Sequence, residues 1–530
     1  MDAVTPRGSV KRLVSADAVV AADGRRGNAV LIEAGRVVAV GDRRDLADGV
    51  PEDTFVGATI VPGLRDAHIH AVPYAALLKG CSLKSARNMA DLKDRIASHA
   101  SELPSSEALM ATRFDDESLA ERRLPTRKDL DDVAPGHPVV IYRYCGHIAV
   151  ANSQALSESG IDATTPDPAG GSIDRDERGV PTGVLRETAA GLVSPALARG
   201  GHVSEDELVE ALTGLAGLGI TSIGAMIGYG EAPSEKLEAE VELWCNVASR
   251  LPIKVHGIVI ADTPQRLEFA ARQLTGVAPR LRWLGIKRFA DGSLGGHTAA
   301  MSSPFADADT LGTYRLTDVD ADLARHSLSL GGMVSIHAIG DRAVEGVLDV
   351  FEDLRRHGAA GADLRMEHLS VISPVQIAKC AELGITASVQ PAFLASETQW
   401  LGRRVGRDRL GWVYPFRSLK ASGLTIAGSS DCPVEPPNPL WGMAAAMDRY
   451  GINEDERLTG LEALAMFTAG AATALREPIP LATGSPADLV VLDVDPETAS
   501  ATDLHNATIL ETYVEGIPVP VDRSKPTWVD

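Results

Sequence analysis

The chain has 530 residues, of which 45% are hydrophobic and 23% charged, and its formal net charge at pH 7 is −21. A hydrophobic content near the globular average excludes wholesale disorder, and 50 glycines with 31 prolines are too few for a fibrous chain. The acidic balance argues against a nucleic-acid partner, because binding to a phosphate backbone needs a basic face.

Short alternating strands, broken by glycine and aspartate, are predicted at both ends of the chain, over residues 12–60 and 484–522. These β-rich ends could form one small sheet domain, or they could be two independent appendages. Periodicity leaves both alternatives open.

The middle of the chain alternates apolar strand-like runs with helical patterns, which is typical of a parallel sheet in an α/β protein. Eight strands are predicted, at Ala58–His70, Gly219–Met226, Ile253–Ile260, Leu284–Ala290, Met333–Ala338, Leu364–Leu369, Thr386–Pro391 and Leu424–Ser430. Eight βα units are what a (β/α)8 TIM barrel requires. The gap at about 71–200 is too long for a simple connection and predicts an inserted subdomain.

Five of the eight predicted strand ends carry a titratable or metal-binding side chain, and the active site of a barrel lies at that edge. The first strand ends in Asp66-Ala67-His68-Ile69-His70. Alternate residues of a strand face the same side, so His68 and His70 point into one space. The other candidates are Lys287, His337, His368 and Asp431, on the fourth, fifth, sixth and eighth strands. Each has a structural explanation by itself, but chance rarely places all six there.

Several ordered stretches of the chain carry a resemblance to a known family. They are residues 61–70, 170–176, 179–185, 287–300, 336–342, 367–368, 388–391, 428–433 and 484–490. With these motifs the chain resembles the metal-dependent amidohydrolase superfamily, in the YtcJ-like branch called amidohydrolase family 3, which includes N-substituted formamide deformylases. The resemblance implies a composite β-sandwich of residues 1–62 and 482–530 and a distorted metal-binding barrel over 63–481.

The resemblance also implies roles for the six candidates. His68 and His70 would bind the more buried metal, and His337 and His368 the second metal. Lys287 would be a carbamylated bridge between the ions, and Asp431 the last ligand and the proton acceptor. Making a lysine of pKa near 10.4 neutral at about pH 7.5 costs about 4 kcal/mol, which burial and metal binding offset. If Lys287 stays unmodified, a mononuclear site is expected.

The expected function is therefore that of a metal-dependent amidohydrolase (EC 3.5-type). One or two divalent ions are expected as cofactors, with zinc favoured by the N/O ligands and iron, manganese or nickel as alternatives. Metal-bound hydroxide would attack the non-peptide C–N bond of an N-formyl or N-acyl amine, with Asp431 as general base and acid. The alternatives are a hydrolase of cyclic amides, imides or carbamates, a metal-dependent isomerase or lyase, and a small-molecule binding protein that retains the metal shell.

Two further histidines are candidates for substrate binding. His147 matches a family segment that lines the substrate side, although it could equally be a loop histidine bonded to the backbone. His297 stands where many relatives have arginine, which could alter the recognition of a polar or negatively charged group. Asp291 and Arg342 have a structural as well as a functional interpretation.

The remaining signals concern compartment and partners. The five cysteines are scattered and contain no CxxC pair, which fits a reducing cytoplasm. No secretory signal is visible, and no apolar run approaches the ~20 residues of a membrane helix. We therefore expect a cytoplasmic protein with a small-molecule substrate and without a nucleic-acid or membrane partner. A homodimer is expected because dimers are common among the relatives.

Overall fold

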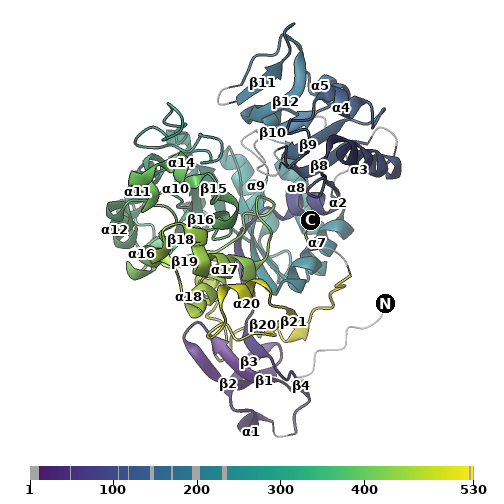
Figure 1. Ribbon diagram of the computed structural model, residues 1–530. Coiled ribbons are helices and arrows are strands. Elements are labelled where there is room, and N and C mark those ends of the chain that lie inside the picture. Colours follow the sequence, from purple (N-terminus) through teal and green to yellow (C-terminus); the bar gives the residue numbers. More distant parts are fainter. Residues whose placement is uncertain are drawn as a thin grey trace. The chain divides into compact units, whose positions relative to one another are not determined.

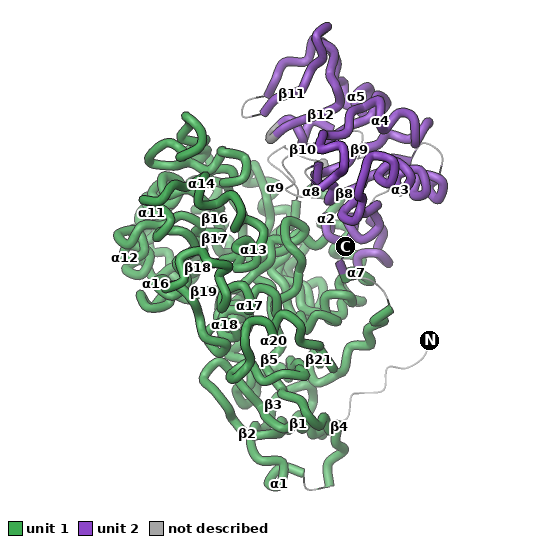
Figure 2. Tube along the Cα trace, in the orientation of Figure 1, with its two compact units in different colours: residues 1–71, 209–527 green, residues 72–208, 528–530 purple. Residues whose placement is uncertain are grey.

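The computed structural model describes residues 11–47, 49–104, 107–116, 118–143, 148–168, 171–193, 203–228, 235–524 and 527–528. The chain divides into two compact units, drawn in green and purple in Figure 2. Residues 1–71 and 209–527 form the first unit, and residues 72–208 and 528–530 form the second. The first unit contains a terminal sheet and a barrel.

Strands from both ends of the chain build the terminal sheet, in which the purple and yellow strands of Figure 1 lie side by side. β5 pairs antiparallel with β20, so that Leu489 lies opposite Pro62. One hydrophobic cluster includes Val14 and Ile60 from one end and Tyr513 from the other. The prediction of one β structure made by both termini is confirmed. The strands are β1 (Lys11–Ala21), β2 (Gly24–Glu33), β3 (Arg36–Gly41), β4 (Glu52–Thr54), β5 (Thr59–Pro62), β20 (Leu489–Leu492), β21 (Ile509–Val514) and β22 (Ile517–Pro518).

Eight parallel strands form the barrel, in the order β6, β13, β14, β15, β16, β17, β18, β19. Beyond the outer two strands, backbone hydrogen bonds run from Asp431 N to His68 O (2.9 Å) and from His70 N to Cys432 O (2.8 Å). These bonds bring the first and last strands together, and the predicted TIM-barrel class is confirmed. The strands are β6 (Leu64–Ile69), β13 (Ile220–Ile227), β14 (Lys254–Val259), β15 (Leu281–Phe289), β16 (Met333–Ala338), β17 (Leu364–His368), β18 (Thr386–Val389) and β19 (Thr425–Gly428).

The predicted first strand, Ala58–His70, is wrong as a single element, because the chain changes sheets at Gly63. β5 ends at Pro62 in the terminal sheet and β6 begins at Leu64 in the barrel. A Cβ atom at Gly63 would lie 2.3 Å from Thr221 Oγ1 and 2.9 Å from Asp488 Cβ. Only glycine permits this close approach of the two sheets.

The helices of the first unit have clear sequence signals at their ends. α12 begins at Pro374 after the capping residue Ser373 and is followed by Gly384, whose φ is 66°. α9 likewise begins at Pro264 after the capping residue Thr263. The bounds are α1 (Arg43–Leu46), α8 (Glu235–Val247), α9 (Pro264–Leu274), α10 (Asp318–Ser329), α11 (Asp341–Arg356), α12 (Pro374–Leu383), α13 (Phe393–Glu397), α14 (Leu401–Val405), α15 (Arg407–Leu410), α16 (Phe416–Ala421), α17 (Pro439–Asp448), α18 (Gly460–Ala465), α19 (Ala471–Ala474) and α20 (Ala501–His505).

The second unit has its own sheet and core. Its strands run in the order β11, β12, β10, β9, β8, β7. Leu92 and Ile96 of α3 pack with Phe114 and Ile141 of the sheet in one hydrophobic cluster. The strands are β7 (Cys81–Ser82), β8 (Leu109–Phe114), β9 (Val139–Arg143), β10 (Ile148–Ala151), β11 (Gly171–Arg175) and β12 (Pro181–Glu187), the helices are α3 (Met89–Glu102), α4 (Arg127–Asp131) and α5 (Ser153–Glu158), and α2 (Ala71–Lys79) and α7 (Glu205–Gly217) cross the boundaries of the unit. None of the described helices is long and apolar enough to cross a membrane.

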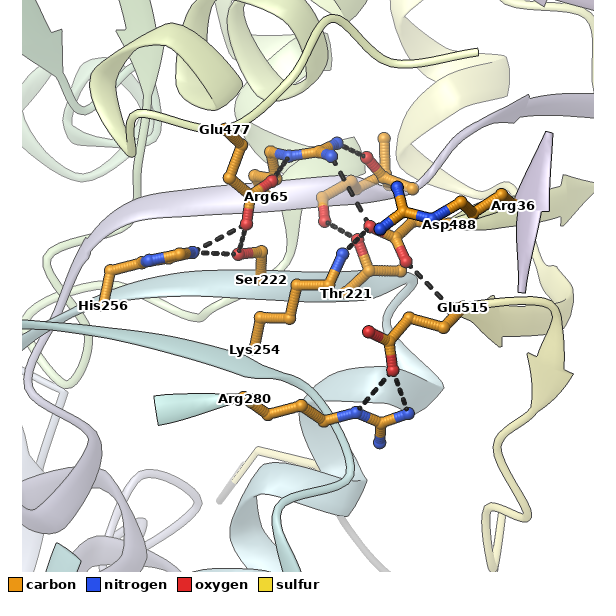
Figure 3. A network of polar contacts seen from close by, with 12 residues as sticks. Arg36, Arg65, Thr221, Ser222, Lys254, His256, Arg280, Glu477, Asp488 and Glu515 are labelled. Atoms are coloured by element: carbon orange, nitrogen blue, oxygen red, sulfur yellow. Dashed lines mark hydrogen bonds and ion pairs between the residues drawn. The ribbon is translucent and has the colours of Figure 1, made fainter. Parts of the chain in front are cut away.

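A buried polar network lies at the amino ends of the barrel strands, against the segment that leads into β20 (Figure 3). Glu477 accepts hydrogen bonds from Arg65 Nε (2.7 Å) and His256 Nε2 (2.6 Å). Asp488 pairs with Lys254 and lies 3.7 Å from Arg65 NH2. Charged groups of opposite sign therefore tie the barrel to the start of the terminal strands.

Candidate metal centre

The carboxyl ends of the barrel strands bring the predicted histidines and Asp431 together. Ligand atoms of His68, His368 and Asp431 lie within 4.8 Å of one another, close enough to hold one metal ion. The ring of His70 lies 5.5 Å from that of His68, and the ring of His337 lies 4.4 Å from that of His368. The histidines expected at two separate ions thus form one continuous cluster, in which His68 is grouped with His368.

Asp431 stands between His68 of β6 and His70, which follows the strand. Its Oδ1 lies 3.2 Å from His68 Nε2 and 3.3 Å from His70 Nε2. Burial alone would raise the pKa of Asp431, but the neighbouring His68 and His70 rings hold that pKa well below its usual range. The carboxyl group is therefore ionised at neutral pH and can serve as a ligand or a base.

Unusual backbone conformations place two of these side chains. The φ angle is 74° at His368 and 57° at Asp431, in the left-handed region that residues other than glycine rarely adopt. Strand alternation would turn Glu367 and His368 to opposite faces. Instead, Glu367 bonds to the His68 ring, and the His368 ring lies 5.2 Å from it. Such conformations concentrate at functional sites, where the surrounding structure holds them in place.

The Nε2 atom of His68 fits a metal ligand. His68 is 1% exposed, and its Nδ1 lies 2.8 Å from Glu367 Oε2. Within the described part of the chain, His68 Nε2 and His70 Nδ1 are buried and have no hydrogen-bond partner. A buried polar atom without a partner is costly, and metal coordination would satisfy it.

His368 is oriented by a neutral acceptor. Its Nδ1 lies 2.8 Å from Gln390 Oε1, and Gln390 Nε2 donates to Ser429 Oγ at 2.9 Å. The second contact fixes the amide so that its oxygen faces the histidine, which leaves Nε2 of His368 as the lone-pair nitrogen. Burial and the neighbouring His337 ring lower the pKa of His368 well below its usual range, so the ring is neutral, as a metal ligand must be.

His337 is held by the loop after β15. Its Nε2 lies 2.9 Å from Gly292 O and 3.2 Å from Asp291 Oδ1. Asp291 is buried and also accepts hydrogen bonds from three backbone amides, those of Ala300, Ile339 and Gly340. Asp291 therefore holds together the loops around His337. Its task is structural, and it is carried out directly beside the candidate site.

Lys287 is buried at the same end of the barrel. It is 1% exposed, and its Nζ lies 5.0 Å from the centre of the Phe289 ring. Burial lowers the pKa of Lys287 to about 8, although the Glu367 and Asp431 carboxylates oppose this shift. A substantial fraction of the amine is then neutral near pH 8, the form that can react with carbon dioxide.

Of the two predicted substrate-binding histidines, His147 lies outside the described residues. His297 is paired with an acid, since its Nε2 lies 2.9 Å from Asp307 Oδ1. Asp307 also accepts a hydrogen bond from Arg404 Nε at 3.0 Å. A substrate group would have to compete with Asp307 for His297, and the substrate-binding role of His297 stays a prediction.

The sequence prediction missed three side chains that support the cluster: Glu367, Gln390 and Asp66. Asp66 accepts hydrogen bonds from the backbone of His68 and Ser430 at 3.1 Å each, and burial raises its pKa to about 6. Asp66 could have been found, because it precedes His68 by two residues and shares its strand face. Glu367 and Gln390 lie within recognisable motifs, but their partners are distant in sequence.

Comparisons with known proteins identify the family of the chain. The family model described as "Amidohydrolase family" matches residues 56–520. YtcJ of Bacillus subtilis (strain 168) is 30% identical over 521 residues, which cover 93% of this chain and 96% of YtcJ. The N-substituted formamide deformylase of Arthrobacter pascens is 30% identical over 524 residues, which cover 92% of this chain and 94% of the deformylase.

Solved structures give the same result. A metal-dependent hydrolase of Pyrococcus horikoshii OT3 has 27% sequence identity and a TM-score of 0.76, and the match covers 93% of this chain and 99% of that one. The resemblance noted in the sequence is confirmed. The chain belongs to the amidohydrolase family and is a metal-dependent hydrolase.

Proposed function

We propose that this enzyme hydrolyses the C–N bond of an N-formyl or N-acyl amine with a divalent metal held at the carboxyl end of the barrel. The observation that carries the proposal is the group of His68, His368 and Asp431, whose ligand atoms lie within 4.8 Å of one another and in which the buried His68 Nε2 has no hydrogen-bond partner among the described residues. The similarity to an N-substituted formamide deformylase over most of both chains supports the class of substrate.

The proposed ligands are His68, His70, His337, His368 and Asp431, with a carbamate on Lys287 where two ions bind. Nitrogen and oxygen donors of this kind favour zinc over softer or harder metals. When bound, a divalent ion supplies Lewis acidity and an activated water at neutral pH.

Asp431 carries the proton transfers in this proposal. Its carboxylate lies against His68 and His70 and is ionised, so it can accept a proton from the attacking water. It then returns that proton to the leaving amine, which could not depart as an anion. Asp66 and Asp291 hold the strand ends and loops in place through backbone amides.

The replacement Asp431→Asn tests this role. The variant is expected to retain metal and to lose at least about a hundredfold in turnover, the low end for a general acid–base group. Turnover near that of the wild type would contradict the assignment. Metal content, measured by elemental analysis, separates loss of the base from loss of the ligand.

The substrate class is tested by amine release from a panel of N-formyl and N-acyl amines. A parallel panel of cyclic amides, imides and carbamates represents the alternative hydrolases. Turnover confined to the second panel would replace the proposed substrate. A chain without stoichiometric metal and without turnover of either panel would be a small-molecule binding protein.

Carbamylation of Lys287 is tested by intact mass in bicarbonate buffer. Because the pKa of Lys287 is lowered to about 8, the reactive neutral amine increases as the pH rises through that value. We expect the carbamylated fraction to rise over the same range and to be absent from Lys287→Met. A fraction that is independent of pH and retained in the variant would place the modification elsewhere.

The cytoplasmic location and the homodimer stay predictions. Cys81, Cys245, Cys380 and Cys432 are all free thiols, which supports a reducing compartment.

A further inference from the structure

Glu367 stands in the barrel interior, immediately behind the candidate metal centre. Glu367 and Arg365 are both 0% exposed. Oε1 of Glu367 accepts hydrogen bonds from Arg365 Nε and Ser335 Oγ, and Oε2 lies 2.8 Å from His68 Nδ1. Three donors thus converge on one carboxylate.

The strand register explains how these donors meet. Ser335 of β16 lies opposite Arg365 of β17, and His337 lies opposite Glu367. Arg365 and Glu367 are separated by one residue, so they face the same side of β17. The Arg365 guanidinium group can therefore donate to the Glu367 carboxylate from the same strand. The His68 ring reaches the carboxylate from a strand that is distant in sequence.

This arrangement determines which nitrogen of His68 carries the proton. An ionised carboxylate only accepts hydrogen bonds, so Nδ1 of His68 must be the donor. In the neutral ring, Nε2 then bears the lone pair, and it lies 3.2 Å from Asp431 Oδ1. A cation between these two atoms would satisfy both of them.

We propose that Glu367 is a positioning residue that holds His68 in the tautomer with Nδ1 protonated and Nε2 free to bind metal, and that Arg365 and Ser335 fix Glu367 for this task. The inference rests on the proposed metal-dependent function and extends it to the residues behind the ligands. Acceptors on the second nitrogen of a ligand histidine commonly set its orientation and basicity.

The barrel contains a natural control for this cluster at its other end (Figure 3). Glu477 also accepts hydrogen bonds from a histidine, a serine and an arginine, which are His256, Ser222 and Arg65. Nδ1 of His256, however, accepts a hydrogen bond from Arg282 Nε at 2.6 Å. Both nitrogens of His256 are therefore satisfied by protein, and this glutamate has a purely structural task.

The variant Glu367→Gln gives the sharpest test, because an amide has only one accepting oxygen. Arg365 Nε is an obligatory donor and Ser335 also donates, so the amide oxygen should face these two groups. The amide NH2 would then face His68 Nδ1 and force the proton onto Nε2, where it blocks coordination. We expect zinc affinity, measured by competition with a chelator, to fall about 10- to 100-fold.

The same replacement at the other end, Glu477→Gln, is the matched control. It should lower the midpoint of urea unfolding and leave zinc affinity unchanged. Wild-type affinity in Glu367→Gln, or an equal loss of affinity in Glu477→Gln, would overturn the inference and leave the proposed function standing. A wild-type protein that binds no zinc would instead overturn both.

A measurement on the wild type covers the case in which Glu367→Gln does not fold. In protein freed of metal and labelled with 15N-histidine, the ring nitrogens of His68 report their tautomer, with the signal assigned by its loss in His68→Gln. We expect Nδ1 of His68 to carry the proton when the ring is neutral. A proton on Nε2 would overturn the inference.

Discussion

Glu367 and Glu477 lie at opposite ends of the barrel and bind the same three donor types, yet their histidines differ at one nitrogen. His256 has both ring nitrogens engaged, by Glu477 and by Arg282. His68 has only Nδ1 in a hydrogen bond, and its buried Nε2, 3.2 Å from Asp431 Oδ1, has no hydrogen-bond partner in the described structure. The donors around the glutamate therefore do not separate the proposed ligand His68 from the structural His256, whereas the hydrogen bonding of the second ring nitrogen does.

The two ends also differ in how their charged side chains are paired. The residues after the carboxyl ends of the strands include His368 and Asp431, both with positive φ. At the amino ends, Arg65, Glu477 and Asp488 form a network of opposite charges that joins two sheets. Positive φ angles occur at both ends, since Arg476 (51°) precedes Glu477 and Glu515 (52°) bonds to Asp488. The paired charges, and not backbone strain, therefore distinguish the amino end, where they hold two sheets together.

The largest expected difference is between His68→Gln and His256→Gln. The first change should remove stoichiometric zinc and turnover together, because it deletes a ligand. The second should keep zinc and lower the free energy of unfolding by about 1.5–3 kcal/mol, the range for a hydrogen bond to a charged group, because burial lowers the pKa of His256 and leaves its ring neutral at pH 7. Elemental analysis and urea unfolding measure the two effects. Loss of zinc in His256→Gln would contradict the purely structural role assigned to His256.

A smaller effect is expected on the free energy of unfolding at acid pH, through Glu477. Burial would raise the pKa of Glu477, but Arg65 and His256 hold that pKa well below the ordinary value of 4.5. The unfolded state then takes up the proton first, so this stabilisation is complete above about pH 4.5 and is lost as the pH falls below it.

The acid effect is measured as the pH dependence of urea unfolding. Below pH 4.5 the wild type should lose up to about 1.4 kcal/mol per pH unit more than Glu477→Gln, which corresponds to one proton. Other buried carboxylates contribute equally to both proteins, so the difference isolates Glu477. If the free energy of unfolding has the same pH dependence in both proteins, the Glu477 carboxylate does not stabilise the fold through its charge.

The smallest expected difference is between Ser335→Ala and Ser222→Ala. Each change removes one neutral donor from a buried glutamate and should cost about 1 kcal/mol in the free energy of unfolding. Only Ser335→Ala should also weaken zinc binding, because only Glu367 orients a ligand. Equal zinc affinities of the two variants would limit the positioning cluster to Glu367 and Arg365.

Much of the fold could be predicted because its signals are local. The apolar runs of the barrel strands alternate with helices that begin at capping residues, and the prediction for β16 coincides with Met333–Ala338. The division of Ala58–His70 into β5 and β6 could not be predicted, because the side chain that Gly63 excludes would meet Thr221 and Asp488, which are remote in sequence.

The candidate site shows the same limit. The sequence by itself determined the ligand-type residues, because histidines, a lysine and an aspartate stand at strand ends that must share one edge of a parallel barrel. Only the tertiary structure decided that His68 groups with His368 and Asp431, that Glu367 orients His68, and that His297 pairs with Asp307. Strand periodicity fixes which face a residue occupies, but closure of the barrel and left-handed backbone at the strand ends decide which residues meet.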